Sequence, residues 1–404
     1  MNDKEYKIPS HLEDIIDFKT AGMTPPNRIV FGFNAAKNLP EEVRRFGEGP
    51  VMLVSDEIMK DIGIVDQAKG YLEDVGLTVD SFTSVEPEPH IETIESLCSL
   101  CIDRSSKVII GIGGGSVMDV SKLAAEAAGS GRPSRDYAEG HITPEGKKLP
   151  LILLPTTSGT GSEVSPYTVV KMGEKKRFLL DQHYYPNMAI IDPLLTVTMP
   201  PSVTASTGID ALSHAIEGMM VRNANVFTET FAISGIGMIS KYMRRAVADG
   251  NDLEARYYMS MAAALCMMAM STSGGSYSHS ASFVISQFKP TAHGVGCGLG
   301  MPYLMEFNRP VIREKLVKIA AAMGEPTWKY SEEYSARQAI LSVVNLMKDC
   351  NLPISLKEYG GIEEGCIEEM AEIMIDNYPR ALNPRVMTKA DALRYYEKMW
   401  HGRY

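Results

Sequence analysis

The sequence lacks a hydrophobic run long enough to cross a bilayer. Its longest mostly apolar stretch, from Met259 to Met270, is shorter than the roughly 20 residues that a spanning helix needs. It also lacks a basic excess, since 40 Lys and Arg oppose 50 Asp and Glu and the net charge is −10. Residues 1–6 lack the basic start and apolar stretch of a signal peptide. We therefore expect a cytoplasmic protein with no membrane and no nucleic-acid partner.

Cysteine is scarce, with 6 residues in 404, and Cys98-x-x-Cys101 has no second Cys-x-x-Cys to complete a four-cysteine zinc site. The pair lies in a helical pattern before a strand, where sulfur packs as a small apolar group. A redox or zinc role is the minor alternative.

The composition is ordinary for a soluble globular protein, with 45% hydrophobic and 22% charged residues, and 404 residues suffice for two domains. From about residue 28 to 192, short β-rich runs alternate with amphipathic helical stretches, which is typical of a mostly parallel sheet. We expect strands at 51–54, 107–110, 149–154 and 188–191, and helices at 58–75, 91–104 and 117–128.

The pattern changes after Asp192-Pro193, where long helical runs replace the strands. These runs lie near 201–220, 226–249, 253–271, 311–323, 332–350 and 366–375. We therefore expect residues 1–192 to form a Rossmann-like α/β domain that binds a nucleotide, and residues 193–404 to form an all-helical domain. A site built by both would lie in the cleft between them.

Two polar, glycine-rich loops follow strands in the first half. The strand at 108–110 runs into Gly111-Ile112-Gly113-Gly114-Gly115-Ser116, and a helical pattern starts at residue 117. Such glycines let backbone amides approach a pyrophosphate, and the helix N-terminus adds a favourable dipole. The second loop, Thr156-Thr157-Ser158-Gly159-Thr160-Gly161-Ser162-Glu163, offers hydroxyls and amides to phosphate, ribose or a carboxamide. The alternative is a tight turn without a ligand.

Asp56 follows the strand at 51–54. A carboxylate there can accept hydrogen bonds from ribose hydroxyls and repel a 2′-phosphate, which favours NAD over NADP. Alternatively, Asp56 caps the next helix.

Two residue pairs in the second half have the spacing of metal ligands. Asp210 and His214 lie one helical turn apart, so that a carboxylate and an imidazole can converge on one point. His279 lies in a polar run and His293 follows in the next loop, so a second helix and that loop can complete the shell. One Asp and three His suit Fe²⁺ or Zn²⁺. The alternatives are a solvated Asp–His pair and histidines satisfied in the core.

These motifs resemble those of the iron-containing (group III) alcohol dehydrogenase family over nearly the whole chain. The resemblance is carried by residues 113–116 with Asp119 and Lys122, by the loop 156–163, by the run 208–218 and by His279 with His293-Gly294. It implies the dehydroquinate synthase-like architecture, with a dinucleotide-binding domain, an all-helical domain, and NAD(P) and a divalent metal in the cleft. It also implies a homodimer or larger homo-oligomer.

Carried over residue by residue, the resemblance implies Asp210, His214, His279 and His293 as ligands, with Fe²⁺ expected and Zn²⁺ as the alternative. It implies that NAD(H) contacts Asp56, Gly113, Gly114, Gly115, Ser116, Asp119, Thr156, Thr157, Thr160 and Lys176. Related enzymes that oxidise glycerol with zinc, or that cyclise sugar phosphates, usually lack the histidine at position 214, so His214 favours the iron-type branch.

Two positions depart from the family pattern. Val117 stands where the family usually has Pro after Gly-Gly-Gly-Ser. Phe283 stands where many members carry a second histidine that acts near the substrate or in proton relay. Phe283 cannot carry a proton, so we expect a metal-centred reaction with no protein acid or base, in which water or a ribose hydroxyl moves the proton, or a different substrate.

We expect hydride transfer between the nicotinamide and a small primary alcohol or aldehyde, including one that bears an anionic group. The predicted substrate pocket comprises Tyr167, Met270, Ser276 and Phe283, and Lys289 is either a contact for an anionic tail or a solvated lysine. Two alternatives stay open: a metal-dependent lyase or cyclase of the dehydroquinate synthase type, and a non-catalytic binder of NAD and metal.

Overall fold

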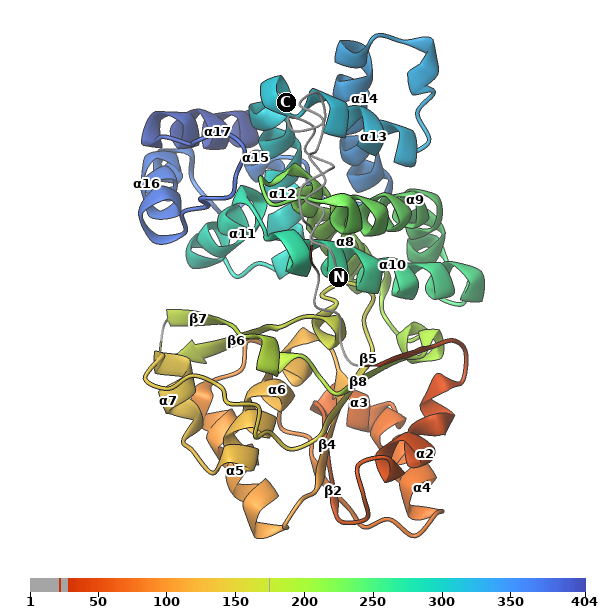
Figure 1. The fold of residues 1–404 in the computed structure, drawn as a ribbon. Helices are drawn as coiled ribbons and strands as arrows, with labels where there is room; N and C mark the ends of the chain where they lie inside the picture. The colour runs from red at the N-terminus through yellow and green to blue at the C-terminus, as the bar shows by residue number, and fades with distance from the viewer. Residues whose placement is uncertain (1–21, 23–27, 174) are drawn as a thin grey trace, which may run out of the picture.

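The computed structural model describes residue 22, residues 28–173 and residues 175–404; residues 1–6, on which the signal-peptide expectation rests, lie outside the described residues. A layered α/β half and a helical half lie one above the other (Figure 1). In the described part every strand ends by Ile191, and every later element is a helix. None of the described helices is both long and apolar enough for a membrane span.

Six parallel strands form the central sheet, in the order β1-β8-β5-β4-β2-β3. Their bounds are β1 Ile29–Phe31, β2 Val51–Val54, β3 Val79–Phe82, β4 Val108–Gly113, β5 Leu151–Pro155 and β8 Met188–Ile191. The predicted strands β2, β4, β5 and β8 are confirmed. They are apolar throughout because both faces of the sheet are covered.

Helices cover the sheet on both faces (Figure 1). They are α2 Leu39–Arg44, α3 Glu57–Asp61, α4 Ile64–Glu73, α5 Ile91–Asp103, α6 Gly115–Ser130 and α7 Ser134–Glu139. Successive residues of β2 alternate between two cores: Met52 packs with α5 and α6, and Leu53 with α2 and α4. The helix expected over 58–75 is wrong as one element, because Gly63, with φ of 82°, separates α3 from α4.

A crevice lies between the carboxyl ends of β2 and β4, because the connections after these strands run in opposite directions, to β3 and to β5. The chain leaves β2 toward the face that α4 covers, and it leaves β4 into α6 on the opposite face. Ligands of open parallel sheets bind where the connections diverge in this way. Asp56 and the glycine-rich loop 111–116 flank this crevice.

An antiparallel hairpin was not predicted from the sequence. Strands β6 Tyr167–Met172 and β7 Lys175–Leu180 pair with each other outside the main sheet. The hairpin lies on the side of the α/β half that faces the helical half (Figure 1). It therefore forms one wall of the space between the halves.

The helical half packs around one large apolar core. Its helices are α8 Pro201–Met220, α9 Val226–Ala248, α10 Leu253–Ser273, α11 Tyr277–Phe288, α12 His293–Asn308, α13 Arg313–Ala322, α14 Glu332–Asp349, α15 Leu356–Tyr359, α16 Ile367–Asn377 and α17 Lys389–His401. The six helices predicted here are confirmed within a few residues. His293, however, is the first residue of α12 and does not lie in a loop.

Candidate metal centre and cofactor cleft

The predicted metal ligands come from three helices of the half that faces the hairpin (Figure 1). Asp210 and His214 lie one turn apart on α8, His279 lies in the first turn of α11, and His293 begins α12. Close packing of α12 on α8 depends on Gly294, where an added Cβ would lie 1.9 Å from the Ser206 carbonyl oxygen. The glycine thus allows His293 to approach Asp210.

The four side chains point toward one volume. Asp210 Oδ1 lies 3.8 Å from Nε2 of His214 and 3.8 Å from Nε2 of His293. The His279 ring stacks on the ring of His214, with centroids 5.0 Å apart. Atoms that share one metal at about 2.0–2.2 Å lie roughly 3–4 Å apart, so these separations suit a common ion.

Unpaired polar atoms test whether the residues fit a metal. Asp210 Oδ1 and His279 Nε2 are both buried, and neither has a hydrogen-bond partner among the described residues. Leaving such atoms unpaired costs free energy. A divalent cation would satisfy both, and the donor set of one carboxylate and three imidazoles is one that Fe²⁺ and Zn²⁺ accept.

Glu217, which was not singled out from the sequence, orients His279. This fully buried carboxylate on α8 accepts a 2.7 Å hydrogen bond from His279 Nδ1. It also accepts hydrogen bonds from the backbone N–H groups of Ser276, Ser278 and His279, at 2.6, 2.7 and 3.2 Å. Because Nδ1 is held by Glu217, Nε2 is the ring nitrogen left to bind a metal once it loses its proton.

The pKa values of this cluster shift in different directions. Burial opposes the charge of His279, but Cys297 and Glu217 outweigh it and raise its pKa well above the usual value, so a metal must displace a proton there. Burial opposes the charge of Glu217, but His279 and these hydrogen bonds outweigh it and lower its pKa to about 2. Burial and the neighbouring imidazoles lower the pKa of His214 well below its usual value. Burial raises the pKa of Asp210 to about 6. Near pH 7, Asp210 is therefore largely ionised and His214 is neutral, the forms in which these groups bind a metal.

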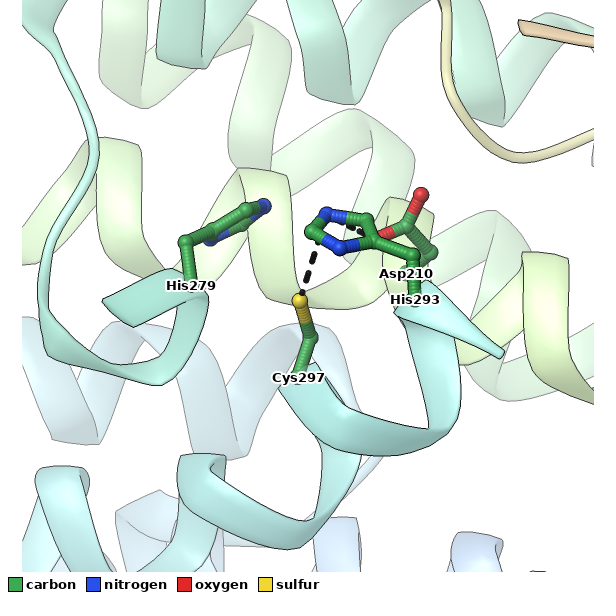
Figure 2. A group of neighbouring side chains, drawn as sticks. All are labelled: Asp210, His279, His293 and Cys297. Atoms are coloured by element: carbon green, nitrogen blue, oxygen red, sulfur yellow. Dashed lines mark hydrogen bonds and ion pairs between the residues drawn. The ribbon is translucent and has the colours of Figure 1, made fainter. Parts of the chain in front are cut away.

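A thiol joins the cluster from below (Figure 2). Cys297 is fully buried on α12, and its Sγ lies 3.6 Å from Nε2 of His293. One ligand atom from each of Asp210, His279, His293 and Cys297 lies within 4.8 Å of the others. The sequence reasoning missed Cys297, although the spacing from His293 to Cys297, one helical turn, matches that from Asp210 to His214.

Seven of the ten predicted cofactor residues line two adjoining cavities. One is lined by Asp56, Gly114, Gly115 and Ser116. The other is lined by Gly115, Ser116, Asp119, Thr160, Lys176 and all four predicted metal ligands. Gly113, Thr156 and Thr157 are not among the lining residues of either cavity. A continuous cleft thus runs from the crevice beside β2 to the metal ligands.

Asp119 and Lys122, on the helix that follows the first glycine-rich loop, form hydrogen bonds to the second loop. Asp119 accepts hydrogen bonds from Ser162 Oγ at 2.9 Å and from the N–H of Val169 at 3.0 Å. The fully buried Lys122 ammonium donates to Ser162 Oγ at 2.8 Å and to the carbonyl of Tyr167 at 2.7 Å. These contacts tie α6 to the second loop and to the hairpin.

Asp56 caps the next helix, as the alternative predicted, and its contact with the ribose stays a prediction. Its Oδ1 accepts a 2.9 Å hydrogen bond from the N–H of Met59 and so caps α3. The residue also lines the cavity beside β2. Because the cap uses one carboxylate oxygen, the other is available to a ligand.

The predicted substrate residues divide into two groups. Tyr167, Met270 and Phe283 line the cavity that holds the metal ligands. Ser276 lies behind it, because its N–H donates to Glu217 and its hydroxyl to Asn383. Lys289 is directed elsewhere, since its ammonium donates to the carbonyls of Tyr359 and Gly360 at 3.0 Å each. It is not among the residues that line this cavity.

Comparisons with known proteins match nearly the whole chain. The model of "iron-containing alcohol dehydrogenase" matches residues 26–193, and that of "Fe-containing alcohol dehydrogenase family, C-terminal" matches residues 204–400. Long-chain-alcohol dehydrogenase 1 of Geobacillus thermodenitrificans is 34% identical over 384 residues, which cover 93% of this chain and 97% of that protein.

Solved structures match as well. A 1,3-propanediol oxidoreductase has a TM-score of 0.89 at 30% identity, covering 95% of this chain and 100% of the other. A sulfoacetaldehyde reductase from Bifidobacterium kashiwanohense, solved with NAD⁺, has a TM-score of 0.86 at 26% identity, covering 94% and 99%. The resemblance found in the sequence is thereby confirmed. The chain belongs to the iron-containing alcohol dehydrogenase family and is an oxidoreductase that interconverts alcohols and aldehydes.

Proposed function

We propose that this oxidoreductase uses NAD(H) and one divalent metal ion, Fe²⁺, to interconvert a small primary alcohol and its aldehyde. The observation that carries the proposal is that Gly115, Ser116 and Thr160 line the same cavity as Asp210, His214, His279 and His293. A cofactor on the loops therefore reaches the metal ligands. The NAD⁺ bound to the related sulfoacetaldehyde reductase supports the choice of cofactor.

In this proposal each group of residues has one task. When bound, the metal supplies positive charge to the substrate oxygen, and NAD(H) accepts or supplies the hydride. Asp210, His214, His279 and His293 hold the metal, and Glu217 keeps His279 in the correct tautomer. Gly114, Gly115 and Ser116 offer backbone amides to the pyrophosphate.

The residues that line the cavity beside the metal ligands exclude water from the reacting atoms. Met270 and Phe283 present apolar surface to the cavity beside the ligands, and the partly buried Tyr167 closes it from the hairpin. In the absence of solvent, charge interactions at the substrate oxygen are stronger. Met270 and Phe283 carry no exchangeable proton, and the Tyr167 hydroxyl donates to the carbonyl of Met270 at 3.4 Å, so we assign that step to water or a ribose hydroxyl.

The proposal is tested by following NADH oxidation with protein that has been purified anaerobically and reloaded with Fe(II) or Zn(II). Short aldehydes should be reduced only by the metal-loaded protein. His279→Ala should lose the turnover because it removes a ligand, whereas the exposed His141→Ala, far along the chain from the ligands, serves as the matched control. Tight binding of NADH and metal without reduction of any aldehyde would overturn the proposal.

The preference for NAD has its own test at Asp56. Asparagine can keep the cap on α3, because its side-chain oxygen can accept from Met59, but it carries no charge against a 2′-phosphate. Asp56→Asn should therefore raise kcat/KM for NADPH relative to NADH by about 10-fold or more, the equivalent of about 1.4 kcal/mol. An unchanged ratio would assign Asp56 to the cap alone.

We also propose how the chain is organised. Two domains that meet after Asp192, residues 1–192 and 193–404, are supported by the separate family models. A reducing, cytoplasmic location is supported by the six cysteines, all of which are free. A homodimer or larger oligomer is supported by the edge strand β1, beside which Ile29 and Phe33 are exposed. Sedimentation of the purified protein tests the last point.

A further inference from the structure

A second cavity opens beside the metal end of the cleft. The two cavities share Val169, Lys176, Phe178 and Phe283, so a bound molecule can extend from one into the other. The residues that line the second cavity include two cations and three aromatic rings, but no carboxylate. The second cavity is therefore suited to a substrate whose alkyl chain ends in a negatively charged group.

Arg380 is held in this second cavity by the helix that carries His279. Its Nε donates a 2.8 Å hydrogen bond to Oγ of Ser280, which is fully buried and follows His279 in the sequence. The Ser280 hydroxyl in turn donates to the carbonyl of Tyr378 at 2.9 Å. Among the residues that the structure describes, Nη1 and Nη2 of Arg380 have no hydrogen-bond or ion-pair partner. The guanidinium is thus fixed at one nitrogen and free at the two that form a bidentate pair.

Two other cations in this region are already engaged, and a third, Lys171, lines the first cavity but not the second. Lys176 Nζ lies 2.5 Å from Glu88 Oε1, so its charge has a partner. Lys289 is held by two carbonyls and lies over the ring of Tyr359, 3.7 Å from its centroid. Of the two cations that line the second cavity, Arg380 is the one with unused donors among the described residues.

Phe283 makes the passage between the metal ligands and Arg380 apolar. Its ring centroid lies 5.6 Å from that of His293 on one side and 5.5 Å from that of Tyr378 on the other. A few methylene groups would lie against this ring while a polar group at each end reached the ligand cluster and Arg380. An apolar ring at position 283 suits this use, because it contacts the methylene groups of the substrate, while the cation that binds the anionic group, Arg380, lies at the far end of the passage.

We propose that the substrate carries an anionic group, a carboxylate or sulfonate, at the end opposite its aldehyde or alcohol, and that Arg380 binds this group. The inference rests on the proposed function, because it places the reacting end at the metal ligands. It names a substrate class and the residue that selects it.

Matched aldehydes test the proposal with metal-loaded protein and NADH. One pair is 4-oxobutanoate and pentanal, and the other is sulfoacetaldehyde and butanal. Each pair has one anionic and one neutral member of similar length. For the wild-type protein we expect kcat/KM at least about 10-fold higher for an anionic member than for its neutral partner, the size of one charge-assisted hydrogen bond.

Variants then assign the effect to the guanidinium. Arg380→Met should lower the ratio of anionic to neutral kcat/KM by about 10- to 100-fold, mainly through KM, and Arg380→Lys should recover part of it because lysine keeps the charge but not the fork. The control is Arg337→Met, which removes an exposed arginine from α14 without touching the cleft. An unchanged ratio in Arg380→Met, or equal use of both members by the wild type, would overturn the proposal.

A binding measurement separates this proposal from the proposed function. Succinamate has an unreactive amide in place of the aldehyde of 4-oxobutanoate, and it can be titrated calorimetrically into the complex with NADH and metal. Tighter binding of succinamate than of pentanamide, lost in Arg380→Met, would support the anion site even if no aldehyde were reduced. Equal binding of the two amides would overturn the anion site even if neutral aldehydes were good substrates.

Discussion

At the residue scale, Glu217 shows how one buried charge organises the candidate metal centre. Its two oxygens accept from the ring of His279 and from three backbone N–H groups at the start of α11. The first turn of that helix has no side-chain cap of its own. The carboxylate therefore stabilises the helix N-terminus and the imidazole tautomer together.

Replacing this charge should weaken metal binding. In Glu217→Gln the amide NH₂ would face a donor, so the orientation of His279 would be lost. We expect metal affinity to fall about 10- to 100-fold, as measured by competition with a chromophoric chelator. Glu254→Gln, on the exposed side of α10, is the matched control. Wild-type affinity in Glu217→Gln would show that the carboxylate only caps α11.

Glu163 is a second buried carboxylate, with a different consequence. It is 2% exposed, its Oε2 has no partner among the described residues, and burial raises its pKa to about 7. The folded protein therefore retains this proton in a pH range where the unfolded chain, with a pKa of 4.5, has lost it. The contribution of Glu163 to the free energy of unfolding therefore falls as pH rises from about 4.5 to 7.

Glu163→Gln removes this titration. Relative to the wild type, its melting temperature should rise between pH 5 and pH 8 by at least about 2 °C, because glutamine stays neutral while the wild-type carboxyl must ionise. Thermal unfolding followed by circular dichroism at both pH values measures the difference. The exposed Glu368→Gln should show no such trend. A difference that is independent of pH would contradict the assignment.

At the element scale, α12 shows where reasoning from sequence was misled. The segment from His293 to Gly300 contains four glycines, and Pro302 follows, which is typical of a loop. The structure forms a helix there because close packing outweighs intrinsic propensity. Where α12 meets α8, no side chain larger than hydrogen fits at position 294.

Gly294→Ala should therefore separate α12 from α8. The added methyl would displace His293 from Asp210, so we expect both lower metal affinity and a loss of about 1–3 kcal/mol in the free energy of unfolding. Gly237→Ala in α9 is the control, since its nearest neighbour would be the carbonyl oxygen of Ala322 at 3.5 Å. That variant should be neutral or slightly more stable. Denaturant unfolding and chelator competition measure both effects.

Strands with a clear apolar pattern were predicted from the sequence, and strands with a weak pattern were not. The four predicted strands are central and buried on both faces, so each is an uninterrupted apolar run. Strand β3 at the sheet edge has an exposed serine, and β7 begins with two lysines and an arginine. Such strands owe their pairing to neighbours distant in sequence, which periodicity does not reveal.

The residues of the candidate site were also predictable only in part. Asp210 and His214 are near neighbours in sequence, so their convergence could be inferred from helix geometry. Glu217 could not be assigned a role, because its partner His279 lies 62 residues away. Arg380 is 100 residues from Ser280, and only the folded chain shows that α11 holds it.

At the scale of the whole molecule, the two halves divide the chemistry between them. All four predicted metal ligands lie on helices α8, α11 and α12, and the two cofactor loops follow strands β4 and β5. The metal can therefore bind before the cofactor arrives. Metal alone at 100 times its Kd should stabilise the helical half by about 2.7 kcal/mol.

Hydrogen exchange should resolve this division. Added metal should slow amide exchange in α8, α11 and α12, and NADH should slow it in the loop between β4 and α6. The His279→Ala variant should respond to NADH but not to metal. Protection of the β4–α6 loop by metal in the absence of NADH would contradict independent binding.

The hairpin of β6 and β7 has a consequence for how such enzymes can diversify. In the proposed function, coenzyme preference and metal binding belong to separate stretches of chain, so recombination near residue 192 would exchange one without altering the other. The hairpin belongs to the first stretch, yet Tyr167, Lys176 and Phe178 face the second across the cleft. A chimaera of two relatives would therefore still bind its metal ion and its nucleotide. Its substrate range would depend on whether the hairpin of one parent fits the helical half of the other.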